Sequence, residues 1–395
     1  MHPLGARKKL NKILELPFPE TRPSETESRP LSAEEWLPQD LRSISEHQSS
    51  LPRVAKDTRL IGEIERALHT LPTQHHLFNG DSRSLNFLSE NSVHLVLTSP
   101  PYWTLKKYRQ HSEQLGEIQD YLAFLDELDN VWRGCYRALV PGGRLVCVVG
   151  DVCLSRRKNG GEHTVVPLHA SIQERCRALG YANLSPIIWH KIANAQFEAT
   201  GNGGGFLGKP YEPNGVIKND VEFILMERKP GGYRSPAFAT RLLSVIPAWQ
   251  HKVWFQQIWT GVTGASTKEH PAPYPMELAE RLVRMFSFAG DTVLDPFMGT
   301  GTTNAAAGRW GRNSIGIEVD PEYFGMSEQR VRKVMRQYDA GQVVAHGDTS
   351  RGEEVCSILN RNSASPFATS GKSGNASKRI KGSKAARKTQ EAARQ

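Results

Sequence analysis

Apolar and polar positions alternate in blocks along the middle of the chain, and these blocks predict strands and helices in turn. Short apolar runs predict strands over residues 75–81, 93–102, 144–151, 184–191, 220–228, 291–297 and 313–320. The segments between them predict helices over residues 82–92, 117–139, 165–180, 276–290, 299–311 and 321–337. Strands that alternate with helices are typical of a mainly parallel sheet that is covered on both faces.

The same pattern divides the chain into three parts. Residues 1–74 form a predicted N-terminal extension, rich in Pro, Ser and Glu and partly disordered, with one short helix over residues 60–71. Residues 75–355 form the predicted α/β domain, in which residues 229–268 interrupt the alternation as an inserted region. Residues 356–395 are rich in Ser, Gly, Lys and Arg and predict a basic disordered tail.

The charge balance favours an anionic partner. The chain carries 50 Lys and Arg against 41 Asp and Glu, a net charge of +9. Nucleic acid is the commonest partner of so basic a protein. Part of the surplus lies at residues 377–395, where the alternative interpretation is a solvated tail.

The five cysteines and the apolar runs restrict the location of the protein. No two cysteines form a Cys-x-x-Cys pair, which argues against a zinc site and a disulfide framework and favours a reducing, cytoplasmic location. The first apolar stretch is broken by Asn11, Lys12 and Glu15, so we expect no signal peptide. No apolar run approaches membrane-spanning length, and we expect no membrane partner.

A glycine turn at residues 293–303, "VLDPFMGTGTT", is the first candidate site. An apolar strand runs into Asp295, and Gly299 and Gly301 then lead into a helix whose first N–H groups favour an anionic group. Glu318 ends the next predicted strand, where its carboxylate can accept hydrogen bonds from ribose hydroxyls. The turn lacks the G-x-G-x-x-G pattern of pyrophosphate sites, so a nucleoside cofactor such as S-adenosyl-L-methionine fits better. The alternative for the glycine turn is a tight strand–helix connection without a ligand, and the alternative for Glu318 is a solvated acid.

A rigid aromatic corner at residues 98–103, "TSPPYW", is the second candidate site, and it also follows a predicted strand. Its two prolines restrict the backbone and remove two N–H donors. Ser99 and the Pro100 carbonyl can accept both N–H bonds of an exocyclic amino group on a base, and Tyr102 offers a face for stacking. A base in a duplex has to leave the stack to reach such a pocket. The alternative is a rigid turn whose aromatic residues cap the core.

The two stretches together resemble the catalytic and cofactor motifs of amino-group DNA methyltransferases. The resemblance covers roughly residues 75–330 and includes "QLGE" and "VVGD" after the first motif. The catalytic motif precedes the cofactor motif, as in the beta group of the family, whose motif order is circularly permuted. The resemblance implies a Rossmann-like methyltransferase fold with a mainly parallel sheet over residues 75–355. It also implies a target-recognition region at residues 229–268, although a structural subdomain remains an alternative there.

The resemblance assigns roles to residues of both motifs. It implies that Asp81 contacts the cofactor's adenine and that Glu318 binds its ribose. The remaining cofactor residues are Asp295, Phe297, Gly299, Thr300, Gly301 and Thr302, and the catalytic residues are Ser99, Pro100, Pro101 and Tyr102. A serine at the head of the catalytic motif is commoner in cytosine-N4 enzymes than in adenine-N6 enzymes.

Basic residues follow two of the predicted strand ends and are candidates for contacts with DNA phosphates. These residues are Lys106, Lys107, Arg109, Arg156 and Arg157. The alternative for each group is a solvated loop.

The sequence therefore predicts a site-specific DNA methyltransferase that moves a methyl group from S-adenosyl-L-methionine to cytosine N4 in double-stranded DNA. The predicted setting is a restriction–modification system with a cognate endonuclease that acts on the same site. The alternatives are an adenine-N6 DNA methyltransferase, an RNA or protein amino-group methyltransferase, and a DNA-binding protein without catalytic activity.

Overall fold

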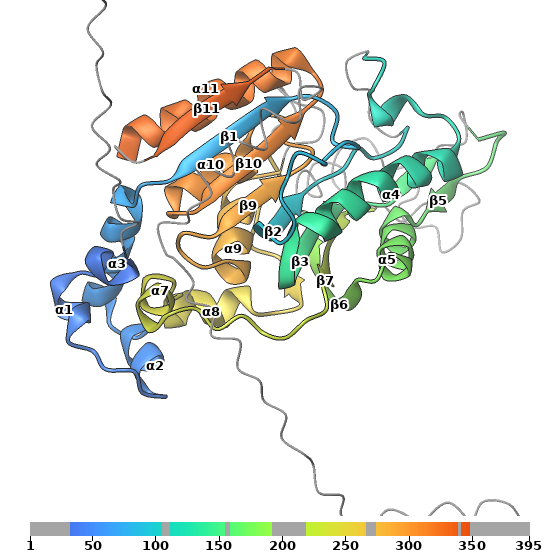
Figure 1. The fold of residues 1–395 in the computed structure, drawn as a ribbon. Helices are drawn as coiled ribbons and strands as arrows, with labels where there is room; N and C mark the ends of the chain where they lie inside the picture. Colours follow the sequence, from blue (N-terminus) through green and yellow to red (C-terminus); the bar gives the residue numbers. More distant parts are fainter. Residues whose placement is uncertain are drawn as a thin grey trace, which may run out of the picture.

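The fold is built on one nine-stranded sheet (Figure 1). The computed structural model describes residues 32–104, 111–154, 159–191, 219–265, 274–338 and 341–347. The sheet order is β11 (Gln342–His346), β1 (Gln74–Asn79), β10 (Asn313–Glu318), β9 (Thr292–Asp295), β2 (Val93–Thr98), β3 (Leu139–Val149), β7 (Val221–Arg228), β6 (Ala182–His190) and β8 (Ile258–Trp259). Neighbours from β11 to β3 pair in parallel, whereas β7 is antiparallel to β3 and to β6. The predicted mainly parallel α/β fold is confirmed.

Helices cover both faces of this sheet, as the alternating pattern predicts. The first face carries α4 (Tyr121–Ala138) and α5 (Leu168–Ala178), and the second carries α9 (Met276–Phe286), α10 (Thr302–Arg309) and α11 (Pro321–Tyr338). The middle strand β2 shows why both layers are needed. Its Val96 belongs to the core under α4, while Leu95 and Leu97 belong to the core under α9. Successive strand residues point to opposite faces, so a strand of continuous apolar residues requires cover on both.

A separate group of short helices packs beside one end of the sheet. It comprises η1 (Ala33–Trp36), α1 (Gln39–Arg42), α2 (Ser50–Val54) and α3 (Thr58–Thr70). Their apolar residues form one cluster with α7 (Phe238–Leu243) and Trp310. Asp57 begins α3, because its carboxylate accepts the backbone N–H groups of Arg59 and Leu60. The single helix predicted at residues 60–71 is therefore one of four.

The predicted inserted region at residues 229–268 contributes structure in three places. Its α7 packs on the N-terminal helices, α8 (Ala248–Trp254) follows, and β8 adds an edge strand beside β6. Two small elements complete the described chain, the turn η2 (Leu115–Glu117) and the hairpin of β4 (Val152–Leu154) with β5 (Thr164–Val166). Within the described residues, no helix combines the length and the apolar character needed to cross a bilayer.

The helix predicted at residues 82–92 is wrong, because this segment forms turns. The Asp81 carboxylate accepts the backbone N–H of Arg83 at 2.9 Å, and the Ser84 N–H donates to the Asp81 carbonyl at 3.2 Å. Short polar side chains compete with helical hydrogen bonding in this way. The apolar residues of the segment, Leu85, Phe87 and Leu88, are buried in the core under α4 without forming a helix.

The boundary predicted after α4 is also different. The sequence places a helix stop at residues 140–143 and a strand from residue 144. The structure begins β3 at Leu139, directly after α4. Gly142 lies in this early part with φ of 80°, and its N–H donates to the Lys229 carbonyl at 3.0 Å. This hydrogen bond joins the proline–glycine segment to the neighbouring strand.

One buried acid of the fold gives a test of the packing. Glu227 of β7 is fully buried, and burial raises the pKa of its carboxyl to about 7. The folded protein therefore binds more protons than the unfolded chain between about pH 4.5 and 7, and its free energy of unfolding falls as the pH rises through that window. We expect Glu227→Gln to stabilise the protein by on the order of 2 kcal/mol near pH 8 and by almost nothing near pH 4.

Chemical denaturation at both pH values measures this difference. Glu162→Gln, at an exposed position, is the control and should show no pH-dependent gain. An equal effect of Glu227→Gln at both pH values would contradict a neutral buried carboxyl.

Candidate functional site

The two motifs meet at the edge of the sheet where the parallel strands end. The strands β1, β10, β9 and β2 are neighbours in that order, so their carboxyl ends lie side by side. One cavity opens there. Its lining residues from these strand ends and the segments after them are Gly80, Asp81, Ser82, Ser99, Pro101, Pro296, Phe297, Gly299, Ile317, Glu318 and Val319. The structure thus brings Ser99 of the aromatic corner and Gly299 of the glycine turn into one site.

The glycine turn adopts a backbone that other residues rarely take. Gly299 and Gly301 have φ of 53° and 79°, in the left-handed region. Gly301 is also confined, since a side-chain Cβ there would lie 3.0 Å from the Cβ of Ser327 on α11. The Gly299 N–H points to the cavity side and donates to the Glu318 carboxylate at 2.8 Å. The turn is therefore held by the acid that ends the next strand.

Glu318 is buried at the floor of the cavity. One carboxylate oxygen accepts the Gly299 N–H and the other accepts the Asp320 N–H at 2.9 Å. Burial raises the pKa of Glu318 to about 7. Each oxygen retains a free lone pair, so the side chain can accept hydrogen bonds from two neighbouring hydroxyls, such as those of a ribose.

Asp295 lies beneath the cavity and not in its lining. Its carboxylate accepts the hydroxyls of Thr98 and Thr303, each at 2.6 Å, and the backbone N–H of Phe297 at 3.1 Å. Burial raises the pKa of Asp295 to about 6, while these donors oppose the change. The Tyr274 hydroxyl contacts that of Thr303 in turn. This network joins the ends of β2 and β9 to the start of α10.

The aromatic corner forms a compact turn at the end of β2. Pro100, Pro101 and Tyr102 are buried, and the Ser99 hydroxyl lies 3.4 Å from that of Tyr102. The Tyr102 ring packs on Gly150, where a side-chain Cβ would lie 3.4 Å from the ring. Trp103 follows with φ of 42°, a left-handed conformation that is strained for a tryptophan. Trp103 and Thr104 form a turn that follows Tyr102.

The other predicted cofactor residues have different positions. Asp81 lines the cavity, and its carboxylate also accepts the Arg83 side chain at 2.7 Å. Thr300 and Thr302 do not line the cavity, because their hydroxyls bond to Arg330 of α11 at 3.0 and 2.9 Å. The predicted DNA contacts Lys106, Lys107, Arg109, Arg156 and Arg157 lie outside the described residues.

Sequence reasoning missed part of the cavity wall. Glu113 and Gln114 line it from the segment before η2, Leu115 lines it from η2, and Tyr323 lines it from α11. The "QLGE" stretch at residues 114–117 was the available signal for the first group. No sequence signal marked Tyr323, because an aromatic residue at helical spacing is equally typical of core packing.

The composition of this cavity fits a nucleoside cofactor. Glu318 supplies acceptors for hydroxyls and Asp81 an acceptor for an amino group. Phe297, Leu115 and Tyr323 supply an apolar and aromatic wall on which a base can pack. Beyond the cofactor residues, the Ser99 oxygen faces the same space, where a second substrate can meet the bound group.

Comparison with known protein families gives an extensive match. The DNA methylase family N6_N4_Mtase matches residues 93–329. The Type II methyltransferase M.MjaI of Methanocaldococcus jannaschii is 35% identical over 291 residues, which are 66% of this chain and 92% of that protein. The Type II methyltransferase M.MthZI of Methanothermobacter thermautotrophicus is 33% identical over 288 residues, or 67% of this chain and 79% of that protein.

Solved structures give a similar result. TTHA0409 of Thermus thermophilus, assigned as a DNA modification methylase and solved with S-adenosyl-L-methionine, is 50% identical to this chain. The match has a TM-score of 0.56 and covers 69% of this chain and 98% of that one.

The network around Asp295 predicts a stability effect. Asp295→Ala leaves the buried Thr98 hydroxyl without its acceptor, whereas Thr303 can still reach the Leu97 carbonyl at 3.3 Å. We expect a loss of about 2–3 kcal/mol in the free energy of unfolding. Asp295→Asn keeps one acceptor oxygen and should lose less. Urea denaturation measures both variants, and an unchanged stability of Asp295→Ala would refute the network as a support of the site.

Proposed function

The chain belongs to the DNA methylase family of N6 and N4 methyltransferases, and on that basis we propose that it methylates the N4 amino group of cytosine in double-stranded DNA. Its cofactor is S-adenosyl-L-methionine, with which the Thermus relative was solved. The observation that carries the proposal is that Ser99, Gly299 and Glu318 line the same cavity. An amino-group acceptor and a nucleoside-binding turn face the same space there.

The chain's own residues orient the reactants. S-adenosyl-L-methionine supplies, when bound, an electrophilic methyl group on a positively charged sulfur. Glu318 and Asp81 hold the nucleoside part, and the glycine turn carries Gly299 close to it. The Ser99 hydroxyl oxygen and the Pro100 carbonyl accept the two N–H bonds of the base amino group and direct its lone pair into the cavity. Such alignment supplies much of the rate of a transfer to a weak nucleophile.

Ser99 supports cytosine over adenine in this proposal. A serine oxygen is a neutral acceptor, and the motif that it heads resembles the catalytic motif of cytosine-N4 enzymes. The second candidate is adenine N6, because its amino group presents the same two donors to Ser99 and Pro100. The two acceptors can bind the amino group of either base, so the methylated product has to be identified to distinguish cytosine N4 from adenine N6.

Further parts of the chain have proposed roles in the same reaction. The catalytic strand β2 precedes the cofactor strand β9 in the sequence, which supports a circularly permuted motif order over a catalytic domain of residues 75–355. Residues 229–268 are the proposed target-recognition region, and the basic residues Lys106, Lys107, Arg109, Arg156 and Arg157 the proposed phosphate contacts. The Type II relatives support a restriction–modification setting with a cognate endonuclease.

A direct product assay tests the proposed function. The full-length protein is incubated with S-adenosyl-L-methionine labelled on its methyl group and with unmethylated genomic DNA. The DNA is digested to nucleosides, and the labelled nucleoside is identified by mass. We expect N4-methylcytosine because Ser99 heads the catalytic motif.

Two other results of this assay are informative. Label on N6-methyladenine would replace the cytosine proposal by its alternative. A lack of label in DNA under conditions in which the cofactor binds would refute DNA methylation, and a parallel incubation with RNA would then test the nearest substitute.

Two variants separate cofactor binding from transfer. Glu318→Ala removes the proposed ribose acceptor and leaves the Gly299 N–H unpaired. We expect at least about a tenfold weaker affinity for S-adenosyl-L-methionine by calorimetry. Ser99→Ala should keep the cofactor affinity and lose about a hundredfold in kcat, because the base amino group loses an acceptor. Exposed Ser84 provides the control Ser84→Ala, which should change neither quantity.

Either variant can contradict its assignment. A kcat of Ser99→Ala equal to that of the unaltered protein would remove Ser99 from the mechanism. An unchanged cofactor affinity of Glu318→Ala would remove the cavity as the cofactor site.

A further inference from the structure

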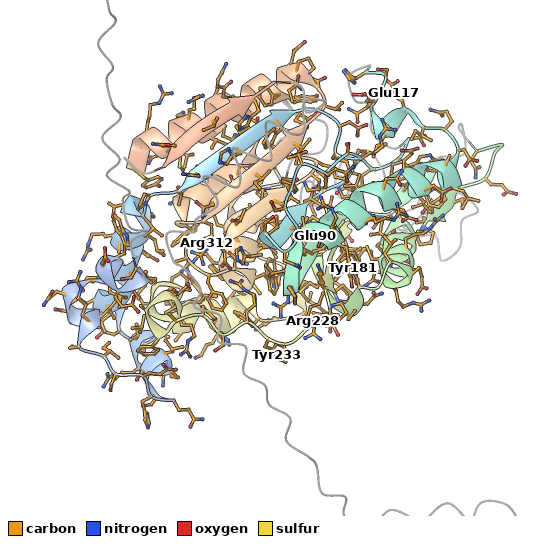
Figure 2. All side chains as sticks on the ribbon, in the orientation of Figure 1. Glu90, Glu117, Tyr181, Arg228, Tyr233 and Arg312 are labelled. Carbon is orange, nitrogen blue, oxygen red and sulfur yellow. The ribbon has the colours of Figure 1, made fainter. Side chains whose placement is uncertain are left out.

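A second cavity lies at the opposite edge of the sheet from the cofactor cavity. Its volume is about 400 Å³, within the range of small-molecule sites. Its wall combines α2, the α7–α8 segment, the last turn of α9 with the loop that follows it, and Arg144 of β3. Arg144 pairs with Leu95 of β2, and Ser99 lies four residues further on, or roughly 13 Å along the strand. Figure 2 shows Arg228, the cross-strand partner of Arg144, near the lower end of the sheet in this view and Glu117 of η2 near the top.

Three arginines line this second cavity, together with one histidine. They are Arg144, Arg241, Arg284 and His251, and the lining among the described residues includes no Asp or Glu. Within the described part of the chain, only Arg241 of these four has an ion-pair partner, the exposed Glu46. The Nε atoms of Arg144 and Arg241 are buried and have no hydrogen-bond partner in the described structure. The site therefore carries a positive charge that no acid of its described lining balances.

Arg284 is the most deeply buried of these groups, at 7% exposed. Its guanidinium carbon lies 3.8 Å from the centre of the Trp310 ring and 5.0 Å from that of Trp254. Within the described residues its N–H groups have no hydrogen-bond acceptor. Two acids act on its charge, Glu65 of α3 and Glu280 of α9, but within the described residues neither forms an ion pair with it, and Glu280 accepts a hydrogen bond from Arg309 at 2.8 Å. A largely buried cation held by two aromatic rings without an ion pair lacks the direct partner that such groups normally have.

A fourth arginine lies directly behind the wall. Arg312 is 1% exposed and donates to the backbone carbonyl of Ser287 at 2.8 Å, and Ser287 lines the cavity. Burial lowers the pKa of Arg312 to about 9, Asp291 opposes this change, and the neighbouring charge of Arg284 adds to it. An anion in the cavity would relieve the repulsion between the two guanidinium groups.

Apart from Ser244 and Ser287, the remaining wall is apolar. Its members include Leu51, Val245, Ile246, Met285, Phe286 and Phe288. We propose that this cavity binds a small organic anion, whose carboxylate or phosphate group pairs with Arg144 and Arg284 while its apolar body packs against the Phe286 side of the wall. Guanidinium forks match both oxyanions in a bidentate geometry. The site is separate from the cofactor cavity and from the proposed DNA methylation.

Binding at this place has a structural effect. The cavity is closed on one side by Leu51 and Pro52 of the N-terminal helices and on the other by the loop before β9. A ligand that contacts both stabilises their packing, because a molecule that binds only the folded state raises its stability. We therefore expect the thermal midpoint of unfolding to rise with ligand concentration.

The test uses the full-length protein saturated with S-adenosyl-L-methionine, so that the cofactor cavity is filled. Phenyl phosphate and phenylacetate are the anionic probes, and benzyl alcohol is the uncharged control. We expect saturable calorimetric binding of one molecule of at least one anion per chain, a rise in the thermal midpoint, and neither effect with benzyl alcohol. Phenylglyoxal modification followed by mass mapping should show that the bound anion protects Arg144 and Arg284, which requires no variant.

The variants Arg144→Met and Arg284→Met should weaken binding of the anion by about tenfold or more. Arg133→Met, on the exposed face of α4, is the control and should bind as the unaltered protein does. The proposal is overturned by absence of saturable binding of both anions, or by protection of arginines elsewhere. Equal affinities of Arg144→Met and the unaltered protein would overturn it as well.

Discussion

The Asp295 carboxylate holds the catalytic and the cofactor halves of the site together. It accepts one threonine hydroxyl from the end of β2 and another from the start of α10, and it lies at the end of β9. The backbone pairing of β2 with β9 ends at Val96 and Leu294, before the chain reaches Ser99 or Gly299. The position of Ser99 relative to Gly299 therefore depends on a buried side-chain network, and the strongest hydrogen bonds of that network are those to an ionised acceptor.

Around this network, each acid at the sheet edge has a distinct task. Glu318 holds the glycine turn through the Gly299 N–H and keeps lone pairs for a ligand. Asp81 lies on the other side of the cavity and is held by Arg83. Asp295 is buried more deeply than Glu318, at 1% against 9% exposed, and it supports the site from below while Glu318 and Asp81 line the cavity. The wall between them is apolar and aromatic, as a nucleoside site requires.

The sequence predicted the features that depend on short-range signals. Apolar runs located β2, β9 and β10, and the glycines of residues 299–301 marked the turn, because left-handed backbone has a strong residue preference. The helix predicted over residues 82–92 was wrong, because Leu85 and Leu88 are buried there in a segment of turns. Thr98, Thr303 and Arg330 could not be found, because their roles depend on partners that are distant in the sequence or on neighbouring elements. The cationic cavity could not be predicted from the sequence for the same reason, since α2, β3 and α9 contribute to it from separate parts of the chain.

The place of β1 in the sheet has a consequence for how the chain reaches its folded state. β1 begins at Gln74, yet its two neighbours are β10 and β11, whose paired residues lie more than two hundred positions later. A ribosome therefore releases β1 long before its two partner strands exist, and α3 long before its partners in α7 and Trp310. Unpaired strand edges and exposed apolar surface are where nascent chains associate wrongly. The first strand to be synthesised is among the last to be paired, and protection of that segment during translation becomes a requirement for producing this protein.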